Sequence, residues 1–327
     1  MNQKQLNKKN NRYWSKREAE ERKWIEANIK TDKDFDRFLQ EHYDTLLDSI
    51  NKDISDQYTR YAKREGYTLA EARKKVAQED VQAFSNQAKK LVAKARKIFK
   101  KKGKVEYADF SDEVNTRLRL YNATMRINRL EMLKAQIGLE MIDNNMDIYS
   151  SMTDRLNNEY VDELKRQAGI LSDSAGAVKV AETSSIVMAS TGNANFSERL
   201  WANSDVFKAK LDQLLTKQMV QGLNPKVIAR DLKPYLKAEV NNARYVTERL
   251  ARTESARVQT QAQLRSFKKY HIRTCKWHAE PSACKICLEI ASRNDGVYSV
   301  DDVPDLPVHP NCRCSISAWH DRTNSDD

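Results

Sequence analysis

Apolar residues recur every three or four positions along much of this chain, the spacing that turns one face of a helix into a core. Over 31–66 this stripe is regular, and His42 lies on it, where we interpret it as a core residue rather than a metal ligand. Thr31 and Asp32 are residue types that cap helix starts, and Gly66 is of the type that ends helices. We therefore expect the first helix to occupy 31–66. The apolar members of its stripe are Phe35, Phe38, Leu39, Leu46, Ile50, Ile54, Tyr58 and Tyr61.

The same spacing predicts helices along most of the remaining chain. No proline occurs before Pro225, and Asn224-Pro225 is a typical helix start, with proline in the first helical position. Residues 168–200 differ, because they are rich in Gly, Ser, Ala and Thr and carry few charges, so we expect them to be irregular or partly extended. The further expected helices begin at Thr68 and at Pro225, and occupy 89–104, 111–167, 204–221 and 239–269.

These patterns predict a mainly α protein with three consecutive regions. The first is a long N-terminal helical region at 1–170, and the second is an irregular connector at 171–200. The third is an α-rich C-terminal domain at 201–327, which ends in a small cysteine-rich α+β module at 275–319.

Composition narrows the class of protein. Of the 327 residues, 31% are charged and the mean hydropathy is −0.79, with no apolar run near the roughly 20 residues that a membrane span needs. The N-terminal segment MNQKQLNKKNNRYW lacks the apolar stretch of a signal peptide, so we expect a cytosol-like setting. A formal net charge of +11 favours a polyanionic or acidic partner, although it can also simply keep a helical protein in solution.

One segment concentrates positive charge. Residues 89–104, KKLVAKARKIFKKKGK, hold nine Lys or Arg and no acid, with an apolar face inside the charge. Such a face can follow phosphates without reading bases, bind an acidic protein, or be an ordinary solvated surface. The candidate nucleic-acid-binding residues are Lys89, Lys90, Lys94, Arg96, Lys97, Lys100, Lys101, Lys102 and Lys104.

The five cysteines all lie near the C-terminus, and four of them form an array with one histidine. It reads C-x2-C-x21-H-x2-C-x-C and supplies Cys284, Cys287, His309, Cys312 and Cys314. Thiolates and imidazole in two close pairs are the donors of a tetrahedral zinc site, and a full set of protein donors favours a structural role. In an extended segment Cys312 and Cys314 would point the same way; in a turn only one would reach the ion. The alternatives are reduced, buried cysteines or a disulfide.

A carboxylate interrupts the apolar stripe of the helix at 239–269. Glu254 stands between Leu250 and Val258, and burying it alone would be costly. Arg257 shares its face at a spacing of three residues, so we favour a structural ion pair over a catalytic acid.

Three motifs follow one another in the C-terminal part of the chain: Arg252-Thr253-Glu254, the Cys284/Cys287 pair, and the segment His309–Cys314, which reads HPNCRC. In this order they resemble the minor head proteins of tailed phages, the Mu F-like head-morphogenesis family. Weaker similarities lie at 11–17 and 196–201, so the resemblance spans about 11–319 and is specific over 196–319. The chain departs from the pattern before the first cysteine pair, where the usual Asp-rich stretch is reduced to Glu280.

The resemblance implies a structural virion protein with no catalytic residues. Such proteins are present in few copies inside the head near the portal vertex, and assist head assembly, DNA packaging or delivery. The implied partners are the portal protein, capsid and scaffold proteins and double-stranded phage DNA, with the host cytoplasm as the site of assembly. The rival hypotheses are a metal-dependent nuclease using Glu254 or the Asp301/Asp302 pair, and a zinc-containing nucleic-acid-binding protein.

Overall fold

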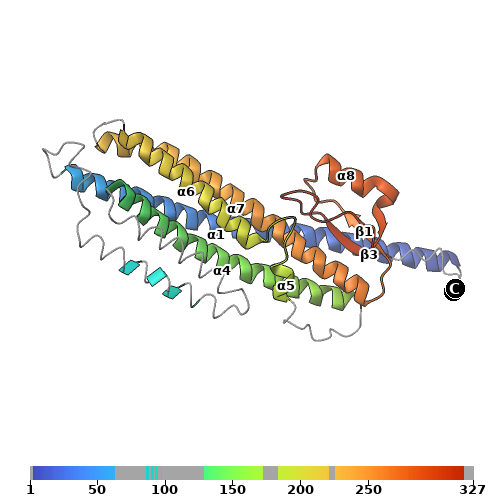
Figure 1. The fold of residues 1–327 in the computed structure, drawn as a ribbon. Coiled ribbons are helices and arrows are strands. Elements are labelled where there is room, and N and C mark those ends of the chain that lie inside the picture. Colours follow the sequence, from blue (N-terminus) through green and yellow to red (C-terminus); the bar gives the residue numbers. More distant parts are fainter. Residues whose placement is uncertain are drawn as a thin grey trace. The chain divides into compact units, whose positions relative to one another are not determined.

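The computed structural model is mainly helical, with a small sheet near the C-terminus, as the sequence predicted (Figure 1). It describes residues 3–62, 86–87, 90–91, 93–94, 97, 129–171, 183–220 and 225–319. The helices are α1 (Gln3–Ala62), α4 (Arg129–Leu171), α5 (Thr183–Val187), α6 (Phe196–Val220), α7 (Pro225–Lys269), α8 (Lys285–Ser292) and the 3-10 helix η3 (Arg293–Gly296). The strands are β1 (Thr274–His278), β2 (Val297–Ser299) and β3 (Ser315–Trp319).

The first helix begins much earlier than the capping residues suggested. Helix α1 starts at Gln3 and continues through position 31, so the prediction that Thr31 and Asp32 cap its start was wrong. Residues 3–30 contain neither glycine nor proline, and nothing in them stops a helix. Asp32 is buried in the middle of the helix, while Thr31 donates to the Ala27 carbonyl. The predicted stop at Gly66 lies outside the described residues.

Two later helices are also longer than expected. Helix α6 begins at Phe196 rather than at 204, and α7 runs without a break from Pro225 to Lys269. Pro234 lies inside α7 but is exposed, so water can hydrate the carbonyl that its missing N–H leaves free. Within 168–200, the described residues include the end of α4, the short α5 and an isolated bridge between Thr191 and Ala194.

The chain divides into two compact units that are each discontinuous in sequence. Unit 1 comprises 1–37, 152–196 and 248–327, and unit 2 comprises 38–151 and 197–247.

Unit 2 is a helical unit with an apolar core. Its buried residues come from α1, α4, α6 and α7, and include Leu39, Ile50, Ile137, Leu211 and Leu236. Tyr43 and Thr247 are buried here as well, with their hydroxyl oxygens 2.8 Å apart. His42 is half-buried, its ring 4.0 Å from that of Phe38 and its Nδ1 2.9 Å from the Phe38 carbonyl oxygen.

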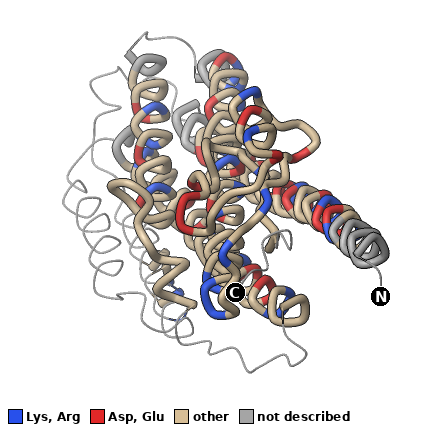
Figure 2. Tube along the Cα trace, turned by 90° about the vertical axis from the view of Figure 1, so that its right-hand side faces the viewer, with Lys and Arg blue, Asp and Glu red and all other residues tan. Residues whose placement is uncertain are grey.

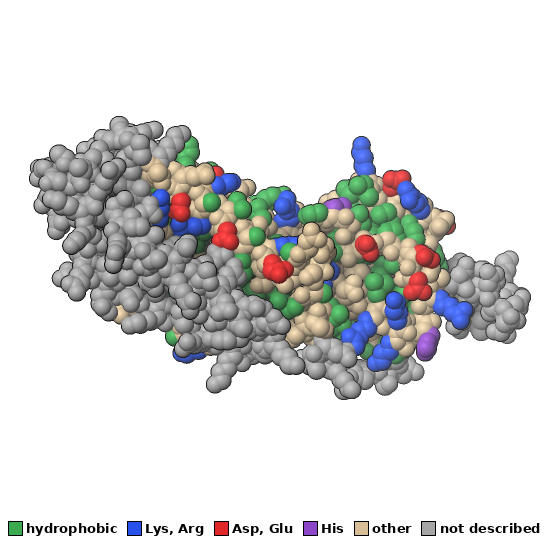
Figure 3. Space-filling model, in the orientation of Figure 1, with side chains coloured by type: hydrophobic (Ala, Val, Ile, Leu, Met, Phe, Trp, Pro, Cys, Tyr) green, Lys and Arg blue, Asp and Glu red, His purple; other side chains and the backbone are tan. Residues whose placement is uncertain are grey.

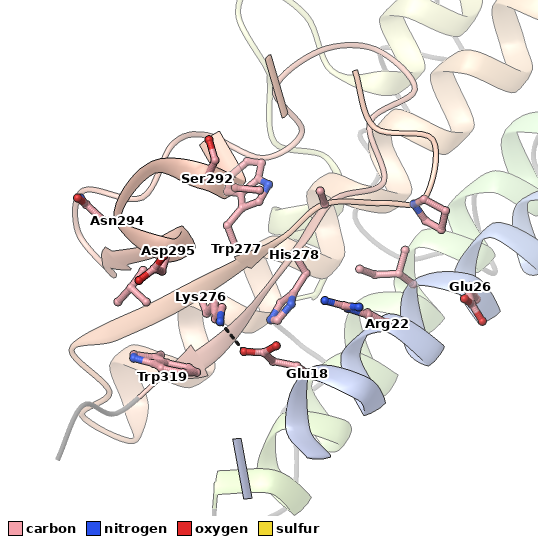
Figure 4. A pocket seen from close by; sticks show the side chains of 15 residues that line it. Glu18, Arg22, Glu26, Lys276, Trp277, His278, Ser292, Asn294, Asp295 and Trp319 are labelled. Atoms are coloured by element: carbon pink, nitrogen blue, oxygen red, sulfur yellow. Dashed lines mark hydrogen bonds and ion pairs between the residues drawn. The ribbon is translucent and has the colours of Figure 1, made fainter. Parts of the chain in front are cut away.

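Unit 1 contains the sheet. The strand order is β2-β1-β3 with both pairings antiparallel, and Thr274 of β1 pairs with Ser299 on one side and Trp319 on the other. Side chains alternate across β1. Cys275 and Trp277 lie in the apolar core that α8 also enters, whereas Lys276 and His278 lie on the face toward α1, near Glu18 and Arg22 (Figure 4). The central strand therefore separates the cysteine-rich core from α1.

Candidate metal centre

Helix α8 presents the first cysteine pair. Cys284 is the residue that precedes the helix, and the Leu288 N–H donates to its carbonyl, while Cys287 lies in the first turn. One turn of helix between them lets both sulfur atoms approach the same point. Cys284 is partly exposed and Cys287 is buried.

The second pair comes from the loop before β3. Asn311 has a φ of 70°, a left-handed conformation that turns the chain between His309 and Cys312. The Cys312 N–H donates to the His309 carbonyl at 3.2 Å, which closes this turn. The loop thereby directs an imidazole and a thiol back toward α8.

Three separations between the donor atoms can be compared with those of a tetrahedral zinc site. His309 Nε2 lies 3.1 Å from the Cys284 sulfur and 3.4 Å from the Cys287 sulfur. The Cys287 and Cys312 sulfur atoms are 3.8 Å apart. Standard Zn–S and Zn–N bond lengths in a tetrahedron predict separations of about 3.8 Å between two sulfurs and about 3.6 Å between sulfur and nitrogen. Cys284, Cys287 and His309 can therefore share one metal ion, and Cys312 adjoins this group through the Cys287 sulfur.

Both cysteines of the final pair face this cluster, as expected for an extended segment. The donor atoms of Cys287, Cys312 and Cys314 lie within 4.8 Å of one another, as do those of Cys284, Cys287 and His309. Cys287 belongs to both groups, so the five predicted ligands form one continuous cluster. Five donors exceed the four positions of a tetrahedral shell.

The thiols differ in how readily they ionise. Hydrogen bonding from the Cys314 thiol lowers the pKa of Cys312 to about 6, and the same bond raises the pKa of Cys314. Burial raises the pKa of Cys287 to about 12, whereas backbone hydrogen bonding at the start of α8 lowers the pKa of Cys284. Metal ligation requires thiolates, and a bound metal ion would itself lower the pKa of each coordinating thiol.

A contact of Nδ1 with the backbone orients the imidazole ring of His309. Nδ1 lies 2.8 Å from the Pro310 carbonyl oxygen, to which a protonated Nδ1 donates. This tautomer leaves a lone pair on Nε2, the atom that faces the two sulfurs.

The Arg-Thr-Glu motif supports the loop that carries these ligands. Arg252 Nε donates to the Asn311 carbonyl at 2.8 Å, and the Asn311 N–H donates to Thr253 Oγ1 at 3.1 Å. Arg252 Nη2 also donates to Glu280 at 2.7 Å, and Glu280 accepts the backbone N–H of Arg313 at 2.8 Å. Glu280 therefore connects α7 to the ligand loop, a role that no sequence pattern indicated.

The expected ion pair between Glu254 and Arg257 is present. Its carboxylate accepts a hydrogen bond from Arg257 Nε at 2.7 Å, and both side chains are buried. The two terminal nitrogens of Arg257 donate to the carbonyls of Ile186 and Val187, at the end of α5. The pair thus attaches α5 to α7.

Sequence reasoning missed a buried charge network next to the cysteines. Arg313 lies between Cys312 and Cys314 and donates to Asp32 at 2.7 Å from Nε and at 2.5 Å from Nη2. Asp32 also accepts a hydrogen bond from Arg155 at 2.6 Å, and Arg155 in turn donates to Glu159 at 2.8 Å. Despite the cost of burial, hydrogen bonds and charge from Arg313 and Arg155 lower the pKa of Asp32.

Cys275 and His278, a further cysteine and histidine near the array, do not join the cluster. Cys275 is buried in the apolar core, and burial raises its pKa to about 12. His278 Nε2 lies 2.8 Å from Ser317 Oγ on the opposite face of β1. Asp301 and Asp302, which the nuclease hypothesis requires, are exposed and belong to neither donor group in the described part of the chain.

The face of the sheet opposite the cysteines borders a cleft of about 1090 Å³ (Figure 4). Glu18 and Lys276 form an ion pair at its edge, and Arg22, Glu26 and Asp295 also line it. These charges are mixed, so the lining does not select a ligand of one charge.

The candidate nucleic-acid-binding segment is described at a few positions. Lys90 and Lys97 are exposed, while Lys94 forms ion pairs of 2.5 Å and 2.9 Å with Asp143 and Asp147. The other candidates lie outside the described residues or have side chains that are not described: Lys89, Arg96, Lys100, Lys101, Lys102 and Lys104. Elsewhere the charges are interspersed, along the described part of α1 (Figure 2) and over the described residues on the face in Figure 3.

Comparisons with protein-family models, curated proteins and solved structures found no match to this chain. Among the described helices, none is both long and apolar enough to cross a membrane.

Proposed function

We propose that this chain is a structural protein of the head of a tailed phage, of the minor head, or head-morphogenesis, type. The observation that carries this proposal is that the three motifs of the resemblance lie together in space. Arg252 and Thr253 hold Asn311 of the HPNCRC segment, and that segment supplies His309 and Cys312 to the Cys284/Cys287 pair. Residues far apart in sequence thus form one unit, as expected if they were inherited together.

The metal of this unit is zinc, held by Cys284, Cys287, His309 and Cys312, with Cys314 donating a hydrogen bond to the Cys312 sulfur. Cys287 joins the two halves of this set, because its sulfur lies 3.4 Å from His309 Nε2 and 3.8 Å from the Cys312 sulfur. Thiolate and imidazole are donors that zinc prefers. Zinc supplies a covalent-like cross-link between α8 and the loop before β3. Four protein donors complete its shell, and a complete shell serves structure rather than catalysis.

The partners are the portal and capsid or scaffold proteins together with double-stranded DNA, at the portal vertex inside the virion. The formal net charge of +11 and the exposed Lys90 and Lys97 support contact with a polyanion. Because lysines reach phosphates without reading base edges, this contact is independent of sequence.

Mass spectrometry of purified virions and proheads tests the proposal. We expect the chain in DNA-filled particles at a few copies, well below the major capsid protein and close to the amount of portal protein. Absence from both particles, together with metal-dependent cleavage of DNA by the purified chain, would replace the proposal with the nuclease hypothesis.

A further inference from the structure

The segment 312–315 has two chemically different sides. Cys312 and Cys314 direct their sulfur atoms toward Cys287, while Arg313 and Ser315 bond to groups on the helices. This is the alternation of an extended chain, in which neighbouring side chains point in opposite directions. Any displacement of the cysteines therefore displaces Arg313 as well.

Arg313 is held on the helix side by side chains from α1 and α7. It is 2% exposed, and besides Asp32 it donates to Gln259 Oε1 at 2.7 Å and to Ser255 Oγ at 2.6 Å. A fork of donors facing a carboxylate is the geometry in which arginine binds most strongly. All of these contacts lie within unit 1.

Asp32 depends on this contact because it is buried. Its side chain is 3% exposed, and without Arg313 its remaining cationic partners are Arg155 at 2.6 Å and Arg252 at 4.0 Å. Arg155 also serves Glu159, and Arg252 also serves Glu280. Removing one member of a buried ion-pair network leaves the remaining charges poorly compensated, which destabilises the fold.

Ser315 supplies a second attachment on the same side. Its hydroxyl donates to Glu21 of α1 at 2.7 Å and accepts a hydrogen bond from Gln263 of α7 at 3.0 Å. Glu21 is itself buried and accepts hydrogen bonds from Arg166 of α4. Ser315 thus bonds directly to α1 and α7, and Glu21 links it to α4.

We infer that Arg313 couples metal binding to the docking of the C-terminal module on α1, so that the two events form one cooperative latch. The inference rests on the proposed zinc site. Between His309 and Cys314 the loop contains no helix or strand, and Arg252, Thr253 and Glu280 bond to its backbone at Asn311 and Arg313. Its side chains are held by the metal on one side and by the Arg313 contacts on the other. Loss of the metal removes the restraint on the cysteine side, which loosens Arg313 and weakens the Asp32 network. By reciprocity, weakening that network lowers the affinity for the metal.

Zinc affinity of the full chain, measured by competition with a chromophoric chelator, tests the coupling. Asp32→Asn is the informative variant, because Asp32 lies 281 residues from Arg313 and is not a candidate ligand. We expect this variant to bind zinc roughly ten-fold or more weakly than wild type, within the range of ordinary couplings between sites. The matched control is Glu18→Gln, which removes the ion pair between Glu18 of α1 and Lys276 of β1. This variant should leave the zinc affinity unchanged.

Hydrogen exchange of the wild-type chain gives a second measurement that does not need a folded variant. On removal of zinc, we expect amides around Asp32 and Arg155 to lose protection together with those of the module. Exchange that rises only within 284–314, or an Asp32→Asn variant with wild-type affinity, would overturn the coupling while leaving the zinc site in place. If the wild-type chain binds no zinc, the proposed metal site falls and the latch falls with it.

Discussion

The sulfur atoms of Cys287 and Cys312 lie 3.8 Å apart although 25 residues separate them. That separation is compatible with two thiolates on a single zinc ion. His309 Nε2 lies 3.4 Å from the same Cys287 sulfur, and its second nitrogen lies 2.8 Å from the Pro310 carbonyl oxygen. The zinc content of the purified chain tests whether these donors bind a metal ion.

We expect the purified, reduced chain to contain about one zinc ion per molecule, measured by elemental analysis, because one tetrahedral shell uses four of the five donors. Cys287→Ser should abolish binding, since Cys287 belongs to both donor groups. Cys275→Ser is the matched control, because this buried thiol lies in neither group and its loss should leave the zinc content unchanged. Metal-free wild-type protein with a folded C-terminal module would refute the site.

Glu280→Gln should destabilise the chain by about 2 kcal/mol, because it weakens charge-assisted hydrogen bonds to Arg252 and to the Arg313 backbone. Denaturant unfolding in excess zinc would measure this change. Glu289→Gln is the control, since the Glu289–Arg293 pair is exposed and its loss should leave stability nearly unchanged. Equal effects of the two substitutions would show that Glu280 does not support the ligand loop.

Asp53 in unit 2 should make stability decline as the pH rises from about 4 to about 7. Burial, helped by the nearby charges of Glu140 and Asp56, raises its pKa from 3.8 to about 6. A group whose pKa is raised in the folded state contributes stability that is complete below its unfolded pKa, 3.8, and lost as the pH rises through about 6. Asp53→Asn should therefore stabilise the chain at pH 7, by about 1 kcal/mol after allowance for solvent screening.

The difference between Asp53→Asn and wild type should vanish below about pH 4, where both side chains are neutral. Asp44→Asn, at an exposed position of the same helix, is the control for the loss of one negative charge. A pH-independent effect of Asp53→Asn would mean that packing, rather than ionisation, determines its contribution.

The sequence predicted those features that depend on local pattern. Helical periodicity identified the helical class, and the spacing of thiols and imidazole identified the cluster formed by Cys284, Cys287 and His309. The i+3 spacing likewise predicted the Glu254–Arg257 pair.

Pairings between distant residues had no comparable signal. Asp32 resembled a helix cap because aspartate favours that position, and its partner Arg313 lies 281 residues away. Glu280 was noted only as a departure from a family pattern, although it links Arg252 to the ligand loop. The spacing leaves the choice between Cys312 and Cys314 open, and both sulfurs lie within 4.8 Å of the Cys287 sulfur.

The basic segment offers a test in which neighbouring lysines should behave differently. Lys90 and Lys97 are exposed, so the double variant Lys90→Gln/Lys97→Gln should weaken DNA binding and flatten its salt dependence, by up to about 0.9 in the log–log slope for each lost phosphate contact. Lys94→Gln should change DNA binding less, because Lys94 is already neutralised by Asp143 and Asp147. It should instead lower stability by about 1 kcal/mol or less, since these pairs are partly exposed.

Titration of a duplex at several salt concentrations, repeated with an unrelated duplex of equal length, separates these outcomes. Equal salt-dependence slopes for wild type and the double variant would show that Lys90 and Lys97 do not contact DNA, and would favour an acidic protein as the partner.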